Sequence, residues 1–219
     1  MSAIHFKRDD FSQKSRISDI EEIVKTFVRE MLGDSDLHGF GHTMRVYNLA
    51  MKIAHNYIKK GFKVNLLALK LAALLHDVGR PLERKEKKHH ALLSVEIARE
   101  LLSKLGLESE LTEKVCDAII SHSFSSRIRP TSIEAKILSD ADKLDAIGAI
   151  GISRCFMLAG ATGRNIHSSI RHFHEKLLKL KSMLFTEPAK EMAEKRHEFM
   201  ISFLRQLEEE LRESNANTH

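Results

Sequence analysis

The stretch LLALKLAALLHDVGRP, residues 66–81, decides the fold of this chain. Its apolar run is interrupted by one charge, Lys70, so it predicts a helix that is buried on nearly all sides. Gly79 and Pro81 stop this helix shortly after the apolar run ends. The residues between the run and these two breakers therefore lie where a helix meets a loop, at a position that a substrate can reach.

His76 and Asp77 occupy that junction. A neutral imidazole beside a carboxylate supplies one nitrogen and one oxygen ligand, and burial of both without a counter-charge would cost several kcal/mol. A divalent cation removes this cost. The alternative is a histidine that interacts with the helix dipole, beside an aspartate that caps the next segment. The dipeptide alone favours neither interpretation.

Three more histidines extend apolar helical stripes and are therefore expected to point inward. Any one of them alone is more often a satisfied buried histidine than a ligand, but three such residues around one His-Asp pair favour a site. The stripes are Val46, Leu49, Ala50, Ile53, Ala54 and Tyr57 after His42; Ser94, Ile97, Ala98, Leu101 and Leu105 after His90; and Leu111, Val115, Ala118 and Ile119 before His122.

A further carboxylate is expected from the segment TSIEAKILSDADKLDAIGAIG, residues 131–151. Its inward stripe places Asp145 nearest the centre, with Asp142 and Asp140 on either side. The inward residues themselves are Ile137, Leu138, Ala141 and Leu144. Spacing does not choose among the three aspartates.

These residues, in this order, resemble the H…HD…D signature of the HD-domain metal-dependent phosphohydrolase superfamily. The resemblance rests on His42 followed by xxRV, on His76-Asp77, and on Asp142 in DKLDA. It implies metal ligands at these four positions, with Asp140 in reserve.

The stretches DADKLDAIGAIGISRCF and 172–210 are similar to the YedJ-type branch of that superfamily, so the resemblance covers nearly the whole chain. There is one departure. The branch usually reads HDxxHxxRV, whereas this chain has Gly39 after His38.

The HAxxSVEIA run that starts at His90, together with His122, resembles the extra histidines that two-metal members of the superfamily place around a second ion. The resemblance thus implies a second site at these two residues, with His89 as a weaker alternative to His90. The other interpretation is a one-metal enzyme in which both histidines line the substrate cleft.

Two imidazoles and two carboxylates leave open positions on a divalent ion (Mn, Fe, Co, Ni or Zn; one or two per chain). Such an ion binds a phosphoryl oxygen and activates a water as the nucleophile, so we expect hydrolysis of a phosphate ester or anhydride with Asp77 at the reacting centre. Arg45, Arg80 or Lys143 is expected to neutralise phosphate charge, although Arg45 is equally suited to pair with a ligand carboxylate. By resemblance, the substrate is a nucleotide or another small phosphorylated metabolite.

Two other functions remain open: a nuclease-type hydrolase acting on single-stranded nucleic acid, and a non-catalytic nucleotide-sensing HD module. The net charge of +5 mildly favours the nuclease, whereas the lack of Trp and the presence of only two Tyr disfavour base stacking. Basic clusters at Lys85, Lys87 and Lys88 and at Lys176, Lys179 and Lys181 would attract phosphorylated substrates or form solvated surfaces. The intact ligand set argues against the sensing module.

The remaining chain predicts an all-α fold, a compact single-domain helical bundle of the HD-domain type with roughly eight or more helices around a buried metal site. The domain spans 1–219, with a disordered tail at about 214–219. A capping box at Ser18 and Glu21 predicts one helix start, and Pro188 predicts another.

The apolar run of about ten residues is far short of the roughly 20 that a membrane span needs, and the first 16 residues are too charged for a signal peptide. We therefore expect a cytoplasmic protein without a membrane partner. Cys116 and Cys155 lack CxxC spacing and are expected to be small buried hydrophobes in a reducing compartment. The oligomeric state is left open.

Overall fold

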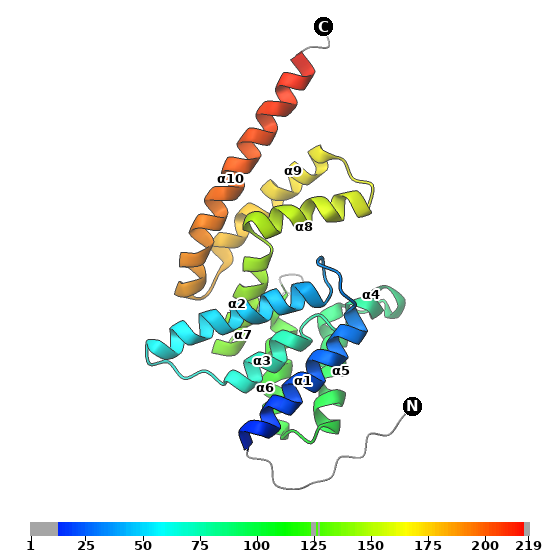
Figure 1. Cartoon of the computed structure of the whole chain (residues 1–219), viewed down its shortest axis with the longest axis vertical. Helices are drawn as coiled ribbons and strands as arrows, with labels where there is room; N and C mark the ends of the chain where they lie inside the picture. Colours follow the sequence, from blue (N-terminus) through cyan, green and yellow to red (C-terminus); the bar gives the residue numbers. More distant parts are fainter. Residues whose placement is uncertain (1–12, 124–125, 127, 217–219) are drawn as a thin grey trace.

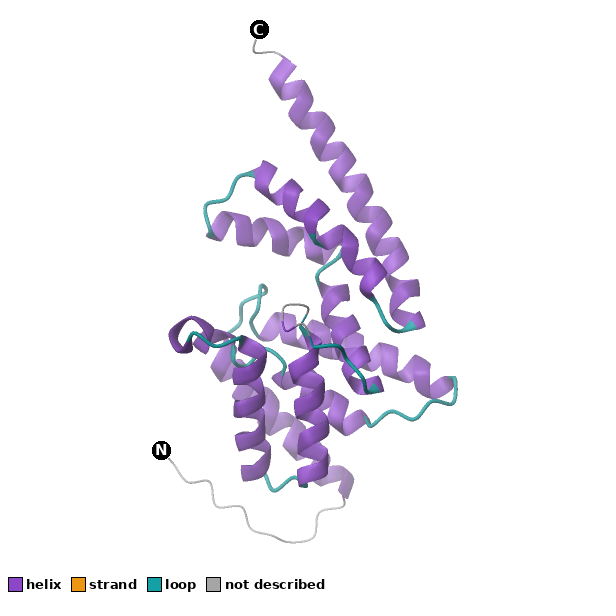
Figure 2. Ribbon diagram, turned by 180° about the vertical axis from the view of Figure 1, so that it is seen from behind, coloured by secondary structure: helices purple, strands orange, loops and turns teal. Residues whose placement is uncertain are grey.

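The computed structural model describes residues 13–123, 126 and 128–216. Within these ranges the regular structure is helical and no strand occurs, which confirms the predicted all-α fold (Figure 2). The helices in chain order are α1 (Gln13–Leu32), α2 (Phe40–Lys59), α3 (Leu66–Leu75), α4 (Arg80–Glu86), α5 (His90–Lys104), α6 (Ser109–His122), α7 (Ile133–Asp145), α8 (Gly148–Ala161), α9 (Ile166–Glu175), the 3-10 helix η2 (Leu177–Met183) and α10 (Glu187–Ala216).

Helix α3 is the buried centre of the molecule. It packs against α1, α2, α6 and α7, and Ala68, Leu69 and every residue from Leu71 to Leu75 are buried. The Asn65 side chain caps its start by accepting a hydrogen bond from the Ala68 amide at 3.0 Å. The apolar run therefore forms the predicted helix, surrounded by other helices.

The end of α3 differs from the prediction in one respect. After Leu75 the chain makes one turn and re-enters a helix at Arg80, so Pro81 lies in the first turn of α4. Gly79 has φ −82° and needs no left-handed conformation. Glycine is needed at this position because there is no room for a side chain. An added Cβ would lie 2.6 Å from the His90 carbonyl oxygen and from the Leu93 Cβ. Glycine here lets α5 approach the turn that carries His76 and Asp77.

Helices α8, α9, η2 and α10 pack together and extend from the side of α7 (Figure 1). The Asp140 carboxylate of α7 accepts hydrogen bonds from the Phe185 and Thr186 amides and from the Thr186 hydroxyl, at 2.7 to 3.1 Å. It therefore holds the segment that leads into α10. Pro188 lies in the first turn of α10, as predicted.

The predicted capping box is wrong, because α1 already begins by Gln13 and Ser18 lies inside it. Glu21 faces the core instead and accepts a hydrogen bond from the Tyr47 hydroxyl at 2.6 Å. It also pairs with Lys70, the one charge of α3, at 2.8 Å. The carboxylate that the pattern assigned to a helix cap therefore lies within the helix and binds residues of α2 and α3.

The predicted disordered tail also begins too early. Helix α10 runs through Ala216, because the LEEELRE sequence before it consists almost entirely of strong helix formers. Residues 217–219 of the predicted tail lie outside the described residues.

Cys116 and Cys155 are buried free thiols, as expected. In the described part of the chain, no single helix has the length and apolar character to span a membrane. Among the described helices, α7 and α8 pass that test when taken together, but they are bent by 67° relative to each other.

Candidate metal centre

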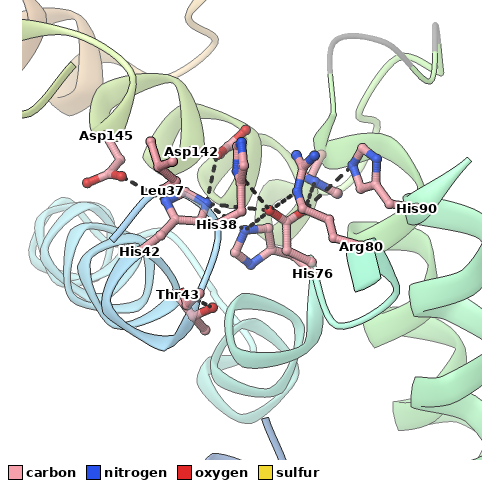
Figure 3. A network of polar contacts seen from close by, with 12 residues as sticks. Leu37, His38, His42, Thr43, His76, Arg80, His90, Asp142 and Asp145 are labelled. Carbon is pink, nitrogen blue, oxygen red and sulfur yellow. Dashed lines mark hydrogen bonds and ion pairs between the residues drawn. The ribbon is translucent and has the colours of Figure 1, made fainter. Parts of the chain in front are cut away.

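The six side chains predicted as metal ligands converge from five separate places in the fold. Figure 3 labels His42, His76, His90 and Asp142 among them. Each lies at or near a helix end next to the turn after α3, and all but Asp142 are buried. The six are His42 in the first turn of α2, His76 and Asp77 after α3, His90 at the start of α5, His122 at the end of α6 and Asp142 in the last turn of α7. The Asp142 side chain is 27% exposed and so forms the open side of the cluster.

The first group surrounds His42. Its Nε2 lies 3.3 Å from His76 Nε2 and 3.6 Å from an oxygen of each of Asp77 and Asp142. The His76 Nδ1 donates to the Ala73 carbonyl oxygen at 2.8 Å, and the His42 Nδ1 donates to Asp145 at 2.8 Å. When both imidazoles are neutral, rings held this way present two lone pairs to each other and form no hydrogen bond. A cation between them would satisfy both.

The second group surrounds the other oxygen of Asp77. His90 Nε2 and His122 Nε2 each lie 3.5 Å from Asp77 Oδ1. Their Nδ1 atoms are already used, by Glu83 at 3.1 Å and by the Ile119 carbonyl oxygen at 2.6 Å.

Among the described residues, Asp77 Oδ1, His90 Nε2 and His122 Nε2 are buried atoms with no hydrogen-bond partner. An unsatisfied buried polar group costs about 1–3 kcal/mol. Three acceptors facing one point are the donor set that a divalent cation requires, so the residues fit a metal.

Protonation in the cluster suits metal binding. Burial alone raises the pKa of Asp77, but His76, Arg80 and His122 lower it more and hold it well below the usual range. Burial lowers the pKa of His76 and of His90 to about 4, so both rings are neutral at pH 7. The exception is His42: burial lowers its pKa, yet its hydrogen bond to Asp145 raises it overall.

Asp145, which periodicity placed nearest the centre of the stripe, lies behind His42. Its buried carboxylate accepts hydrogen bonds from His42, from Arg45 Nε at 2.7 Å and from Arg154 Nη1 at 2.7 Å. Arg45 also pairs with Asp36 at 2.7 Å. Asp145 therefore fixes the ring orientation of His42, and Arg45 pairs with a carboxylate next to the ligands.

Asp140 is the one predicted ligand candidate that lies away from the cluster. Its two oxygens are taken up by the Phe185 and Thr186 groups at the start of α10. Asp140 therefore has no contact with the cluster, and Asp142 is the α7 carboxylate that faces His42, so the ligand prediction is kept for Asp142.

Arg80 and Lys143, the two other cationic side chains predicted to act in catalysis, have different surroundings. Arg80 Nε donates to Asp77 Oδ2, and its side chain is 26% exposed. Lys143 is buried, with Nζ donating to the Ser139 hydroxyl at 2.5 Å, and that hydroxyl donates to the His122 carbonyl oxygen at 2.9 Å. Burial lowers the pKa of Lys143. Arg80 is therefore the cation beside the cluster, and Lys143 supports the end of α6.

A family model described as HD domain matches residues 39–147. YpgQ of Bacillus subtilis, an uncharacterised protein, is 39% identical over 206 residues, which cover 90% of this chain and 96% of YpgQ. The chain belongs to the HD-domain family.

Solved structures agree with this family assignment. YpgQ in complex with ADP has a TM-score of 0.72 and 36% identity, covering 87% of this chain and 97% of that one. An HD-superfamily hydrolase from Bacillus thuringiensis has a TM-score of 0.68 and 32% identity, and the match covers 92% of this chain and 99% of that one. A predicted HD-superfamily hydrolase from an uncultured Thermotogales bacterium has a TM-score of 0.65 and 33% identity, and the match covers 87% of this chain and 92% of that one. These likenesses support a hydrolase, while the YedJ-type branch stays a prediction.

Several lysines of the two basic clusters are paired at the surface of this HD-domain protein. Lys88 pairs with Glu96, and Lys181 pairs with Glu194 at 2.5 Å. Lys85 is 80% exposed and pairs with Glu86 at 3.9 Å. These contacts favour the interpretation as solvated surfaces.

Sequence reasoning missed His38, Glu83 and Arg154. His38 Nδ1 lies 3.9 Å from Asp77 Oδ2, and Glu83 orients His90. Arg154, from α8, contacts both Asp145 and the backbone before α2. None of them extends a helical stripe, so periodicity carries no signal for them. His38 and Arg154 also lie outside the segment that the HD model matches.

Proposed function

We propose that this protein is a divalent-metal-dependent phosphohydrolase that cleaves a phosphate ester or anhydride of a nucleotide or another small phosphorylated metabolite. The observation that carries the proposal is the set of buried acceptor atoms of Asp77, His90 and His122, next to the facing lone pairs of His42 and His76. A divalent cation satisfies several such acceptors at once.

The proposed ligand set has two halves that share Asp77. Asp77 Oδ2 serves the half that contains His42, His76 and Asp142, and Oδ1 serves the half that contains His90 and His122. Divalent ions held there would supply Lewis acidity, lowering the pKa of a water and polarising a phosphoryl oxygen. Membership of a hydrolase-containing family and the donor set both support this chemistry.

The protein's own groups would orient and neutralise the substrate. Arg80 keeps Asp77 ionised and is part-exposed beside it, so its guanidinium is our candidate for binding phosphate charge. A nucleotide is the favoured substrate because the YpgQ structure, at 36% identity, contains ADP. The cytoplasm remains the expected location.

The test is a screen of nucleoside mono-, di- and triphosphates, other phosphorylated metabolites and single-stranded nucleic acid, with Mn, Co, Ni, Zn or Mg added after chelation. We expect hydrolysis of a nucleotide that requires added metal. Hydrolysis that is indifferent to chelation, or cleavage of nucleic acid alone, would contradict the proposal.

Metal count is tested by elemental analysis of the wild type, His122→Ala and His55→Ala. We expect two metals per chain in the wild type and about one in His122→Ala, because this variant removes one of the three acceptors of the second half. His55 is exposed on α2 and serves as the control. One metal in both wild type and His122→Ala would instead assign His122 to substrate positioning.

A further inference from the structure

His38 lies among the side chains drawn in Figure 3, on the turn that leads into α2. Its side chain is 41% exposed, whereas the Asp77 carboxylate, 3.9 Å from His38 Nδ1, is buried. Its ring meets the His42 ring edge-on, with centroids 5.9 Å apart. An imidazole in this place can reach both the cluster and a bound substrate.

Arg154 decides which nitrogen of His38 carries the proton. Its Nη2 lies 3.4 Å from His38 Nδ1, within hydrogen-bond distance. A guanidinium nitrogen can only donate, so Nδ1 must accept and the proton must reside on Nε2.

The turn that holds His38 is fixed from two sides. Arg154 Nη2 donates to the Leu37 carbonyl oxygen at 2.5 Å. Arg45 Nη2 donates to the Asp36 carbonyl oxygen at 2.8 Å. The backbone on the N-terminal side of His38 is therefore anchored to α8 and to α2, so the ring is presented from a rigid support.

We propose that His38 is a substrate-contacting residue that donates a hydrogen bond from Nε2–H to a phosphoryl oxygen of the nucleotide, and that Arg154 is the positioning residue that sets its tautomer. The inference rests on the proposed function. His38 lies in a group with His42 and Asp77 that could hold a metal ion. The proposal assigns His38 to the substrate instead, and it gives the helices beyond residue 147 a part in the site. A neutral N–H donor beside Arg80 suits an oxygen whose negative charge grows during hydrolysis.

The amide variants of His38 test this assignment directly, because glutamine places an N–H near the Nε2 position and asparagine places one near Nδ1. We expect His38→Gln to keep most of the activity. His38→Ala and His38→Asn should lose about 10- to 100-fold in kcat/KM, the range for one hydrogen bond to a charged group. Metal content should stay at the wild-type value in all three variants.

The positioning role of Arg154 has its own readout. Long-range ¹⁵N–¹H NMR should show the Nε2–H tautomer of His38 in the wild type and a mixture in Arg154→Ala, with added guanidinium restoring part of the lost activity. Arg196→Ala is the matched control, because Arg196 donates to the Leu144 carbonyl oxygen at 2.5 Å without contacting Asp145 or His38 through any hydrogen bond found in the described residues. It should leave the His38 tautomer unchanged.

Three results would overturn the inference: loss of metal in His38→Ala, equal activity in all the His38 variants, or an Nδ1–H tautomer in the wild type. Affinity for ADP, measured with metal present, separates this inference from the proposed function. If the wild type hydrolyses no nucleotide but binds ADP, weaker binding by His38→Ala than by His38→Gln still supports the contact. Equal ADP binding by the two variants would refute it.

Discussion

Asp140 and Asp142 lie two residues apart on α7, and their carboxylates face different partners. Asp142 Oδ1 lies 3.6 Å from His42 Nε2, while Asp140 accepts three hydrogen bonds from Thr186 and Phe185 within 2.9 Å. The first carboxylate belongs to the cluster and the second to the junction with α10. Replacing Asp142 by an amide should therefore affect catalysis, whereas replacing Asp140 by an amide should affect stability.

We expect Asp142→Asn to abolish hydrolysis, because an amide is a poor ligand and carries no charge. Asp140→Asn should retain metal and measurable activity but lose about 1–3 kcal/mol of unfolding free energy, since an amide cannot accept all the bonds that Asp140 makes. Enzyme assays and urea denaturation of both variants measure the activity and the free energy of unfolding. An inactive, stable Asp140→Asn protein would mean that the ligand assignment on α7 is wrong.

The Glu21 carboxylate makes stability depend on acid pH. Burial raises its pKa, but Lys70, Tyr47 and Lys25 lower it to about 2. Since the folded pKa lies below the unfolded value of about 4.3, Glu21 stabilises the fold above that value and its contribution is lost as pH falls toward 2.

Glu21→Gln should therefore cost about 2 kcal/mol at pH 7, after allowance for solvent around the two part-exposed lysines. The difference from wild type should shrink as pH falls from 4.5 toward 2. Chemical denaturation at several pH values measures it. A difference that stays constant over that range would show that the carboxylate charge does not matter.

Three of the cluster histidines could be predicted because each continues an apolar stripe on its own helix. His42, His90 and His122 are all buried, as that pattern requires. The choice among the three aspartates needed the structure, because all lie close together on one helix and differ only in what packs against them. His38 and Arg154 were out of reach because their contact joins residues 116 positions apart.

At the level of helices, the turn after α3 and the start of α5 must touch for His90 to reach Asp77. Gly79 allows this contact and its amide donates to the Ser94 hydroxyl at 2.9 Å. A Cβ at Gly79 would meet the His90 carbonyl oxygen, the Leu93 Cβ and the Ser94 amide at 2.6 Å. Two of these atoms belong to the backbone of α5 and the third is bonded to it, so α5 itself would have to move.

Gly79→Ala should therefore destabilise the protein by about 1–3 kcal/mol and weaken the half of the site that contains His90. Gly160→Ala is the control, because no atom lies within 4 Å of its added Cβ. That variant should be neutral or stabilising by up to about 1 kcal/mol. Thermal denaturation and metal analysis of both proteins test the pair; equal behaviour would remove the packing argument.

The central helix was predictable from its uninterrupted apolar run, and its neighbours from their stripes. The starts of helices were less so. Ser18 and Glu21 match a capping box, but α1 begins before them, and Glu21 binds Tyr47 on α2 and Lys70 on α3. A local pattern cannot report partners that are 26 and 49 residues away.

For the whole molecule, the helices after residue 147 are tied to the HD-matched segment at several points. Arg154 of α8 binds Asp145, Arg196 of α10 binds the Leu144 carbonyl oxygen, and Asp140 binds the turn before α10. All these contacts meet at α7, which also carries Asp142. The position of one ligand therefore depends on both parts of the chain.

The central claim is that one buried cluster, built from distant parts of the chain and shared through Asp77, holds divalent metal. Elemental analysis of wild type, Asp77→Ala and Asp117→Ala, purified in parallel and checked for helical content, tests it most directly. Asp117 is an exposed carboxylate on α6 and serves as the control. We predict strong loss of metal in Asp77→Ala only. Full metal occupancy in a correctly folded Asp77→Ala protein would contradict the account.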